Sequence, residues 1–325
     1  MNFAVIGTNF ITDTFLSAAA LHREFKLVAV CASSKVKAEL FAAKYGNVPG
    51  YGDYRELLKV KNLDAVYIAT PNDLHCEMAL FFLENGIPVL CEKPLAPNLI
   101  QVCSMVEASA RKGTLLMEGI VPLFLPNFQS IRDHLHQLGP VRKGYFTYCQ
   151  YSSRYDKLKA GALPNAFNPA HRGGSLMDIG IYPLYHAVSL FGKPDKVTAT
   201  ARLLPTGVDG SGVVILHYKD KELVVSHSKV SDTALPSEIQ GESGCITYTG
   251  GSVPRSAQLC LRGGIVVDIS KIQHKQRLYY ELEEFIRCVK AGGIQSNVAP
   301  HSLALDVYGL TDRIRKQTGV KYSID

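Results

Sequence analysis

Short apolar runs alternate with helical patterns over the first third of the chain. Each apolar run is hydrophobic throughout, which is typical of strands buried on both faces of a parallel sheet. Their alternation with helices predicts a sheet that helices cover on both sides. The predicted strands are 3–7, 26–32, 64–70, 88–93 and 115–119, and the predicted helices are 11–23, 35–46, 53–60, 75–86 and 98–112.

The hydrophobic pattern changes near residue 120, where apolar and polar positions begin to alternate. Alternation with a period of two predicts antiparallel strands that have one covered face. The predicted strands are 141–152, 196–205, 212–230, 237–250, 257–263 and 264–270, and amphipathic helices are predicted at 276–292 and 302–319. We therefore expect an α/β protein with a doubly wound domain over 1–120 and an α+β domain over 121–325, built on a large, mostly antiparallel open sheet.

The composition is that of an ordinary globular protein, with 46% hydrophobic and 20% charged residues among 325. A chain of this length is expected to form two domains. The net charge of +6 is mild and the lysines and arginines are scattered, so we expect no nucleic-acid partner. A modest positive field suits an anionic ligand such as a cofactor that carries phosphate.

The eight cysteines are not spaced as C-x-x-C and have mostly apolar neighbours. This distribution favours free thiols in a reducing cytosol over disulfides or a metal site. The N-terminal sequence MNFAVIG lacks the pattern of a signal peptide, and no apolar run is long enough for a membrane span. We therefore expect a soluble cytoplasmic protein that binds no membrane and no metal.

The first predicted strand runs directly into Gly7 and a helix, which is where a dinucleotide phosphate binds in doubly wound folds. The glycine pattern G-x-G-x-x-G is incomplete, because the segment reads GTNFIT and has Asn9 and Thr12 at the later glycine positions. Asparagine tolerates unusual backbone angles, so we expect the turn to form. The alternative is a tight strand–helix turn without a ligand. The predicted cofactor contacts here are Gly7, Thr8, Asn9, Phe10 and Ile11.

The end of the second strand bears on the choice of cofactor. An NAD site usually carries an acid there for the ribose hydroxyls, but this strand ends at Ala32. Ser33, Ser34 and Lys35 offer hydroxyls and positive charge, which suit a 2′-phosphate. We therefore predict NADP(H) as the preferred cofactor, with NAD(H) as the alternative. The same residues are placed to cap the helix that follows.

The third strand ends in the segment ATPNDLH, at the edge of the sheet where ligands lie in open α/β folds. Asn72 or Asp73 is also expected to cap the next helix, which His75 begins. The predicted cofactor contacts in this segment are Thr70, Pro71, Asn72 and His75.

The fourth strand ends on Glu92 and Lys93, in the sequence IPVLCEKPLA. Pro94 has no N–H to donate, so strand pairing should stop there. We expect this end to hold the Lys93 ammonium group beside the nicotinamide, where it donates to a substrate hydroxyl oxygen. Glu92 and Lys93 are both predicted cofactor contacts. The alternative is a solvated ion pair at a strand end.

The segments GTNFIT, ATPNDLH and CEKPLA, together with GGSLMDIGIYPLYH at 173–186, resemble those of the Gfo/Idh/MocA family, which includes glucose–fructose oxidoreductase and inositol dehydrogenase. The resemblance covers nearly the whole chain. It implies a Rossmann domain, an NAD(P) cofactor, and hydride transfer to or from a hydroxyl-bearing carbon of a sugar, polyol or dihydrodiol.

The last of these motifs resembles one branch of the family in particular. In inositol-dehydrogenase-like members a histidine follows the aspartate by four residues, whereas Tyr182 follows Asp178 here. A tyrosine is similar to the glucose–fructose oxidoreductase and dihydrodiol dehydrogenase branches. This resemblance implies that Lys93 and Tyr182 take part in proton transfer, and it disfavours a cyclitol substrate.

Asp178 and Tyr182 are one helical turn apart and are expected to share a helix face, with His186 one turn further. We expect Tyr182, assisted by Lys93, to move the hydroxyl proton during hydride transfer. Asp178 is expected to orient the substrate or Lys93. His186 is a candidate substrate contact, with a buried core histidine as the alternative. The segment 167–172 either covers the nicotinamide or forms a surface loop.

Two other classes of function stay open: a dinucleotide-binding sensor without turnover, and a structural or interaction protein. The combination of Lys93, Asp178 and Tyr182 argues against a sensor, which needs no acid–base groups. A large exposed sheet face is a liability in solution, so we expect a homodimer or homotetramer that pairs through the C-terminal sheet.

Overall fold

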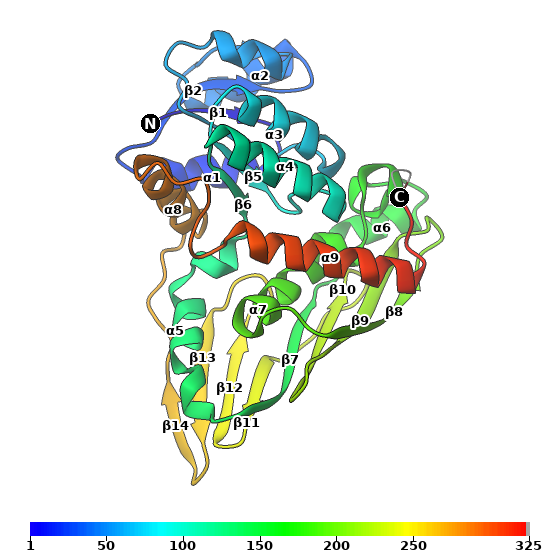
Figure 1. Ribbon diagram of the computed structural model, residues 1–325. Helices are drawn as coiled ribbons and strands as arrows, with labels where there is room; N and C mark the ends of the chain where they lie inside the picture. Colours follow the sequence, from blue (N-terminus) through cyan, green and yellow to red (C-terminus); the bar gives the residue numbers. More distant parts are fainter. Residues whose placement is uncertain (323–325) are drawn as a thin grey trace. The chain divides into compact units, whose positions relative to one another are not determined.

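The structure, a computed structural model, describes residues 1–322. The chain forms two compact units, which Figure 1 shows coloured along the sequence. The first contains Met1–Ile120 and His274–His301, and the second contains Val121–Gln273 and residues 302–322. The functional division into 1–120 and 121–325 stays a prediction, and its last three residues lie outside the described part.

The first unit contains a six-stranded sheet in the order β3-β2-β1-β4-β5-β6, in which every neighbouring pair is parallel. This is the strand order of a Rossmann fold, and it confirms the predicted fold class. Its strands are β1 (Asn2–Ile6), β2 (Lys26–Cys31), β3 (Gly50–Tyr51), β4 (Ala65–Ile68), β5 (Val89–Glu92) and β6 (Leu116–Gly119). The two-residue β3 was not predicted.

Helices connect these strands, as the sequence pattern predicts. They are α1 (Phe10–Ala19), α2 (Lys35–Ala42), α3 (His75–Glu84) and α4 (Leu99–Lys112). One further helix of this unit, α8 (Leu278–Lys290), comes from the second half of the chain and connects none of these strands. Neighbouring residues set both ends of helix α4: the Asn98 side chain caps its start, and Gly113, with φ 61°, ends it. The segment predicted as a helix at 53–60 is a 3-10 helix at Tyr54–Lys59, capped by Asp53.

An aromatic cluster joins α8 to the first sheet. The ring centroid of Phe285 lies 5.6 Å from that of Phe3 on β1. Phe15 of α1 stacks on Tyr67 of β4 with 3.8 Å between centroids. All four side chains are fully buried, and burying each contributes about 1.5–3 kcal/mol. This packing explains why a helix more than 150 residues away in sequence belongs to the first unit.

The second unit contains an eight-stranded sheet in the order β14-β13-β12-β11-β7-β10-β9-β8. All neighbours are antiparallel except β7 and β10, as predicted for a mostly antiparallel sheet. The strands are β7 (Val141–Cys149), β8 (Lys196–Leu203), β9 (Asp209–His217), β10 (Glu222–Ser228), β11 (Ser237–Gly241), β12 (Gly244–Thr249), β13 (Ser256–Leu261) and β14 (Ile265–Asp268).

Helices lie against this second sheet, as Figure 1 shows for α5 and α7. The helices are α5 (Pro126–His134), α6 (Ser153–Lys159), α7 (Ile181–Phe191) and α9 (His301–Thr318). Phe146 and Val225 are fully buried, whereas Tyr145 and Val213 are 41% and 42% exposed, so buried and exposed positions alternate along the strands. Helices α5 and α6 were not predicted. None of the helices within residues 1–322 has the length and apolar character that crossing a membrane requires.

Candidate active site

Gly7 follows β1 at the point where the strand order of the first sheet reverses. Its φ of 106° is in the region that favours glycine. A Cβ at this position would lie 2.2 Å from the Ala69 carbonyl oxygen, so only glycine fits beside the end of β4. The close approach of β1 and β4 thus explains why this glycine is present although the later two are not.

Asn9 caps helix α1 instead of adopting an unusual backbone. Its φ and ψ are −92° and 178°, ordinary extended values, so the explanation drawn from the sequence is wrong. Its Oδ1 accepts hydrogen bonds from the Ile11 and Thr12 amides, and its Nδ2 donates to the Ala69 carbonyl oxygen at 2.8 Å. Thr12 is fully buried, so a threonine fits at the position of the third glycine.

The turn before α1 suits an anionic group. Phe10 is 68% exposed, and Thr8, Asn9 and Ile11 are each at least partly exposed. The start of a ten-residue helix carries partial positive charge, which favours a phosphate there. The five residues predicted at this turn therefore fit the pyrophosphate of a dinucleotide.

Polar groups also gather at the end of β2. The Ser34 hydroxyl accepts a hydrogen bond from the Lys37 amide at 3.3 Å and caps α2, as predicted. The Lys37 ammonium group donates to the Ser33 hydroxyl at 3.2 Å. Ser33, Ser34 and Lys35 are all exposed. This set of hydroxyls and ammonium groups has the chemistry that binds a phosphate.

His75 lies between two strand ends in the first unit. The ring is 1% exposed, with Nδ1 2.9 Å from the Pro94 carbonyl oxygen and Nε2 3.0 Å from the Thr70 carbonyl oxygen. Burial lowers the pKa of His75, and a neutral ring has one N–H, so one of the two contacts is a hydrogen bond at a time. His75 thus links the ends of β4 and β5. Leu74, not Asn72 or Asp73, occupies the N-cap of α3, and its side chain makes no capping hydrogen bond.

Glu92 is buried at the end of β5 and is not part of a solvated pair. It is 7% exposed, and the Tyr67 hydroxyl donates to its Oε1 at 2.6 Å. Burial raises the pKa of the Glu92 carboxyl, although the Tyr67 hydrogen bond and the charge of Lys93 both oppose this shift. The alternative of a solvated ion pair is therefore excluded for Glu92.

A second carboxyl, Glu281 of α8, is buried in the same unit and was not predicted. It is fully buried, and within residues 1–322 neither of its carboxyl oxygens has a hydrogen-bond partner in the protein. Burial, and then the charge of Glu92, raise its pKa well above the usual range. Leu278, Leu282 and Phe285 share its buried helix face, so the spacing along α8 contained a signal for its burial.

Lys93 is partly exposed and stands in a segment whose backbone is held on both sides. Tyr67 binds the side chain of Glu92, and His75 contacts the carbonyl of Pro94. The Leu95 amide donates to Glu118 Oε1 at 3.1 Å. These contacts hold the residues on both sides of Lys93 at the carboxyl end of β5.

In the second unit, Asp178 lies on a π-helical segment, Leu176–Gly180, directly before α7. A π-helix has an extra residue in each hydrogen-bonded turn. Asp178 and Tyr182 were expected to share a helix face because they are four residues apart, and that spacing applies to an α-helix, not to this segment. The Asp178 carboxylate accepts a hydrogen bond from the ammonium group of Lys229, a residue that no sequence pattern assigned to the site.

Tyr182 is partly exposed, and its ring contacts the ring of Tyr148 on β7 edge-on, with 5.9 Å between centroids. His186 is 1% exposed, with Nδ1 3.0 Å from the Tyr248 hydroxyl and its ring 4.9 Å from that of Phe128. Burial lowers the pKa of His186 to about 3. This placement favours the core histidine over the substrate contact.

The segment 167–172 forms two short 3-10 turns, Asn165–Phe167 and Pro169–His171. Phe167 is fully buried and Arg172, with φ 56°, is 9% exposed. The segment is therefore anchored to the second unit at both ends and is more than a surface loop.

Two family models match the chain. The model of an oxidoreductase family with an NAD-binding Rossmann fold matches residues 1–120, and that of the GFO/IDH/MocA C-terminal domain matches residues 129–247. The scyllo-inositol 2-dehydrogenase (NADP(+)) IolU of Bacillus subtilis (strain 168) is 42% identical over 325 residues, which are 100% of this chain and 99% of that protein.

Two further proteins resemble the chain along most of its length. The trans-1,2-dihydrobenzene-1,2-diol dehydrogenase of Danio rerio is 31% identical over 319 residues, 93% of this chain and 91% of that protein. The solved structure of aldose–aldose oxidoreductase from Caulobacter crescentus has a TM-score of 0.86 at 21% identity, with 98% and 97% of the two chains covered. That likeness shows the common fold.

The name of the Bacillus relative includes a cyclitol. The resemblance to the family that was seen in the sequence is confirmed in both halves of the chain. The chain therefore belongs to the GFO/IDH/MocA family of NAD(P)-dependent oxidoreductases and joins its NAD-binding Rossmann domain to its C-terminal domain.

Proposed function

We propose that the protein is an NADP(H)-dependent dehydrogenase that oxidises a CH–OH group of a sugar, polyol or dihydrodiol, or reduces the corresponding carbonyl. The names of the two relatives support a cyclic polyol or diol. The observation that carries the proposal is the place of Lys93 at the carboxyl end of β5, between neighbours that hydrogen bonds hold, two strands from the turn after β1. All eight cysteines are free, which supports a reducing, cytoplasmic location.

The residues divide the chemistry among them. When bound, the nicotinamide ring accepts or supplies the hydride at C4. Tyr182 takes the hydroxyl proton as the C–H bond breaks, and returns it in the reverse reaction. Lys93 donates a hydrogen bond to the substrate oxygen and stabilises the charge that develops there. Asp178 accepts a hydrogen bond from a second substrate hydroxyl and so orients the ring.

The test of this function is a screen of cyclitols, sugars and vicinal diols with NADP+ and NAD+, followed by the absorbance of the reduced cofactor. Turnover of at least one class supports the dehydrogenase. Tight binding of the cofactor, measured by fluorescence, without turnover of any class would favour the sensor instead. A protein that binds neither dinucleotide would contradict both.

The cofactor preference is a separate prediction. We expect kcat/KM to be about tenfold or more higher with NADP+ than with NAD+, because a charged hydrogen bond to the 2′-phosphate is worth about 1.5–3 kcal/mol. Lys35→Met together with Ser33→Ala is expected to remove most of this preference and leave kcat with NAD+ unchanged. Lys61→Met, exposed before β4, is the control. A wild-type enzyme that prefers NAD+ would reject the assignment.

We further propose that the protein is a homodimer or homotetramer that pairs through the second sheet. Tyr145 and Val213 are 41% and 42% exposed on this sheet, and the edge strand β14 exposes Ile265 and Val266 by 56% and 60%. Light scattering after gel filtration is expected to give two or four times the chain mass of 35.6 kDa. Val213→Glu is expected to shift the mass toward the monomer. A wild-type monomer at micromolar concentration would rule out the proposal.

A further inference from the structure

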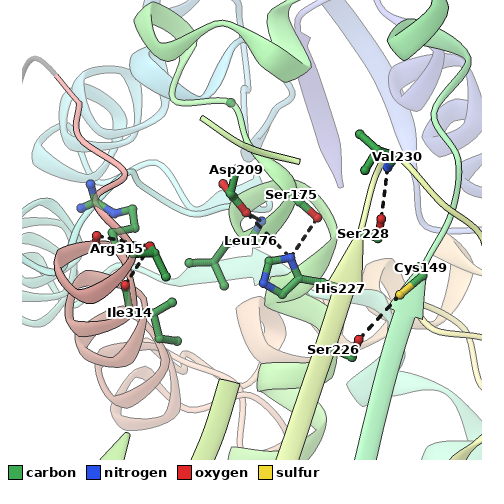
Figure 2. A network of polar contacts seen from close by, with 12 residues as sticks. Cys149, Ser175, Leu176, Asp209, Ser226, His227, Ser228, Val230, Ile314 and Arg315 are labelled. Atoms are coloured by element: carbon green, nitrogen blue, oxygen red, sulfur yellow. Dashed lines mark hydrogen bonds and ion pairs between the residues drawn. The ribbon is translucent and has the colours of Figure 1, made fainter. Parts of the chain in front are cut away.

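The π-helical segment that carries Asp178 is held at its start by a buried aspartate. Asp209 of β9 is 1% exposed, and its Oδ2 accepts a hydrogen bond from the Leu176 amide at 2.6 Å, as Figure 2 shows. A Cβ on Gly174 would lie 2.3 Å from Asp209 Oδ1, so the chain there approaches the carboxyl as closely as a glycine allows. A π-helix is rare and persists where its surroundings support it, often at functional sites.

His227 of β10 packs against the same segment but carries no positive charge near pH 7. Its Nδ1 lies 2.9 Å from the Ser175 hydroxyl, and Figure 2 shows this contact beside Asp209. A Cβ on Gly180 would lie 2.8 Å from the His227 ring, so the segment packs directly on the imidazole. Burial lowers the pKa of His227 to about 4, so the ring is neutral near pH 7. The positive charge that pairs with Asp178 therefore comes from a different residue.

Lys229, directly after β10, supplies that charge. The residue is 6% exposed, and its ammonium group pairs with the Asp178 carboxylate and lies 5.8 Å from the centroid of the Phe167 ring. Its backbone is fixed as well: its amide donates to the Gly210 carbonyl oxygen at 2.8 Å, and its carbonyl accepts from the Ser152 amide at 2.9 Å. The Lys229 side chain therefore reaches Asp178 from a backbone that is held on both sides.

The two partners of the ion pair differ in their access to solvent. The Asp178 side chain is 33% exposed, whereas that of Lys229 is 8% exposed. A dissolved substrate can thus reach the carboxylate while the ammonium group lies behind it. A buried ion pair adds little stability compared with an apolar pair of similar size, so stability alone does not explain this arrangement.

We propose that Lys229 is a positioning residue that holds the Asp178 carboxylate in the orientation in which it accepts a substrate hydroxyl. The inference rests on the proposed function, because it takes Asp178 as a substrate contact. Asp209 fixes the start of the π-helical segment and Lys229 fixes its acidic side chain, so two neighbouring strands, β9 and β10, set the direction of one carboxylate.

The main test is Lys229→Met, which keeps a long unbranched side chain and removes the charge. We expect kcat/KM to fall about 10- to 100-fold, mostly through a higher KM, because misplacing a group that positions the substrate costs about that much. Lys229→Arg is expected to recover activity to within about fivefold of the wild type. The dissociation constant of NADP+ is expected to stay unchanged. Lys219→Met, exposed on the turn before β10, is the matched control.

A double variant keeps the test decisive if Lys229→Met, which leaves a carboxylate without its cation, is unstable. Asp178→Asn with Lys229→Met removes both charges. If Lys229 acts only by positioning Asp178, kcat/KM of the double variant is expected to be no lower than that of Asp178→Asn alone. Losses that multiply in the double variant would overturn the inference. The inference would also be overturned if Asp178→Asn raises KM but Lys229→Met leaves KM unchanged. That result would not contradict the proposed function. Full turnover in Asp178→Asn would instead contradict the proposed role of Asp178.

Discussion

Replacing Lys93 by methionine is expected to lower kcat by about two to four orders of magnitude, the range that a positioned proton-transfer group contributes. Methionine keeps the length of the side chain but cannot donate to the substrate oxygen. Because Glu92, Pro94 and Leu95 are held by contacts that do not involve the Lys93 side chain, the backbone is expected to keep its position. The measurement is steady-state kcat with NADP+ and the best substrate from the screen.

Two comparisons separate a loss of chemistry from a loss of folding. The Lys93→Met variant is expected to bind NADPH, by fluorescence titration, within a few-fold of the wild type. Lys61→Met removes an exposed lysine that precedes β4, at the end of the sheet opposite Lys93, and is expected to leave kcat unchanged. If kcat of Lys93→Met is within about threefold of the wild type, Lys93 has no part in proton transfer.

The first sheet was predictable because the pattern that marks each strand lies within a few neighbouring residues. Each strand is a short apolar run followed by a turn, and a parallel sheet needs little beyond this rhythm to be recognised. Ser34 was predicted as a cap for the same reason, since its hydroxyl binds an amide only three residues away. Strand β3, with two residues, has no pattern of its own, and its pairing with β2 depends on the rest of the fold.

The parts that were missed depend on partners that are distant in the sequence. Asp178 was recognised from a motif, but its partner Lys229 is 51 positions away and becomes its neighbour only when β10 packs on the π-helical segment. The contacts of the His75 ring with the carbonyl groups of Thr70 and Pro94 also had no signal in the sequence, and its assignment to the cofactor stays a prediction. The π-helix itself was read as α-helix, because hydrophobic periodicity does not distinguish one inserted residue.

Tyr182→Phe is expected to lower kcat by about two to four orders of magnitude with little change in KM, because the phenol acts on a proton that moves only in the transition state. Phenylalanine retains the ring, so the edge-on contact with Tyr148 is expected to persist. The measurement is kcat and KM for the best substrate at saturating NADP+. Tyr218→Phe is the control. It removes a hydroxyl that is hydrogen-bonded to the Gly192 carbonyl oxygen and is expected to leave kcat at the wild-type value.

The combination of Tyr182→Phe with Lys93→Met tests whether the two residues act in one step. Groups that act as a unit show losses that do not multiply, so the double variant is expected to have a kcat close to that of the slower single variant. If the losses multiply, Lys93 and Tyr182 act in separate steps and the mechanism proposed for them is wrong. Because Lys93 lies at the end of β5 and Tyr182 at the start of α7, in different units of the chain, a shared loss would show in solution that one reaction needs both units.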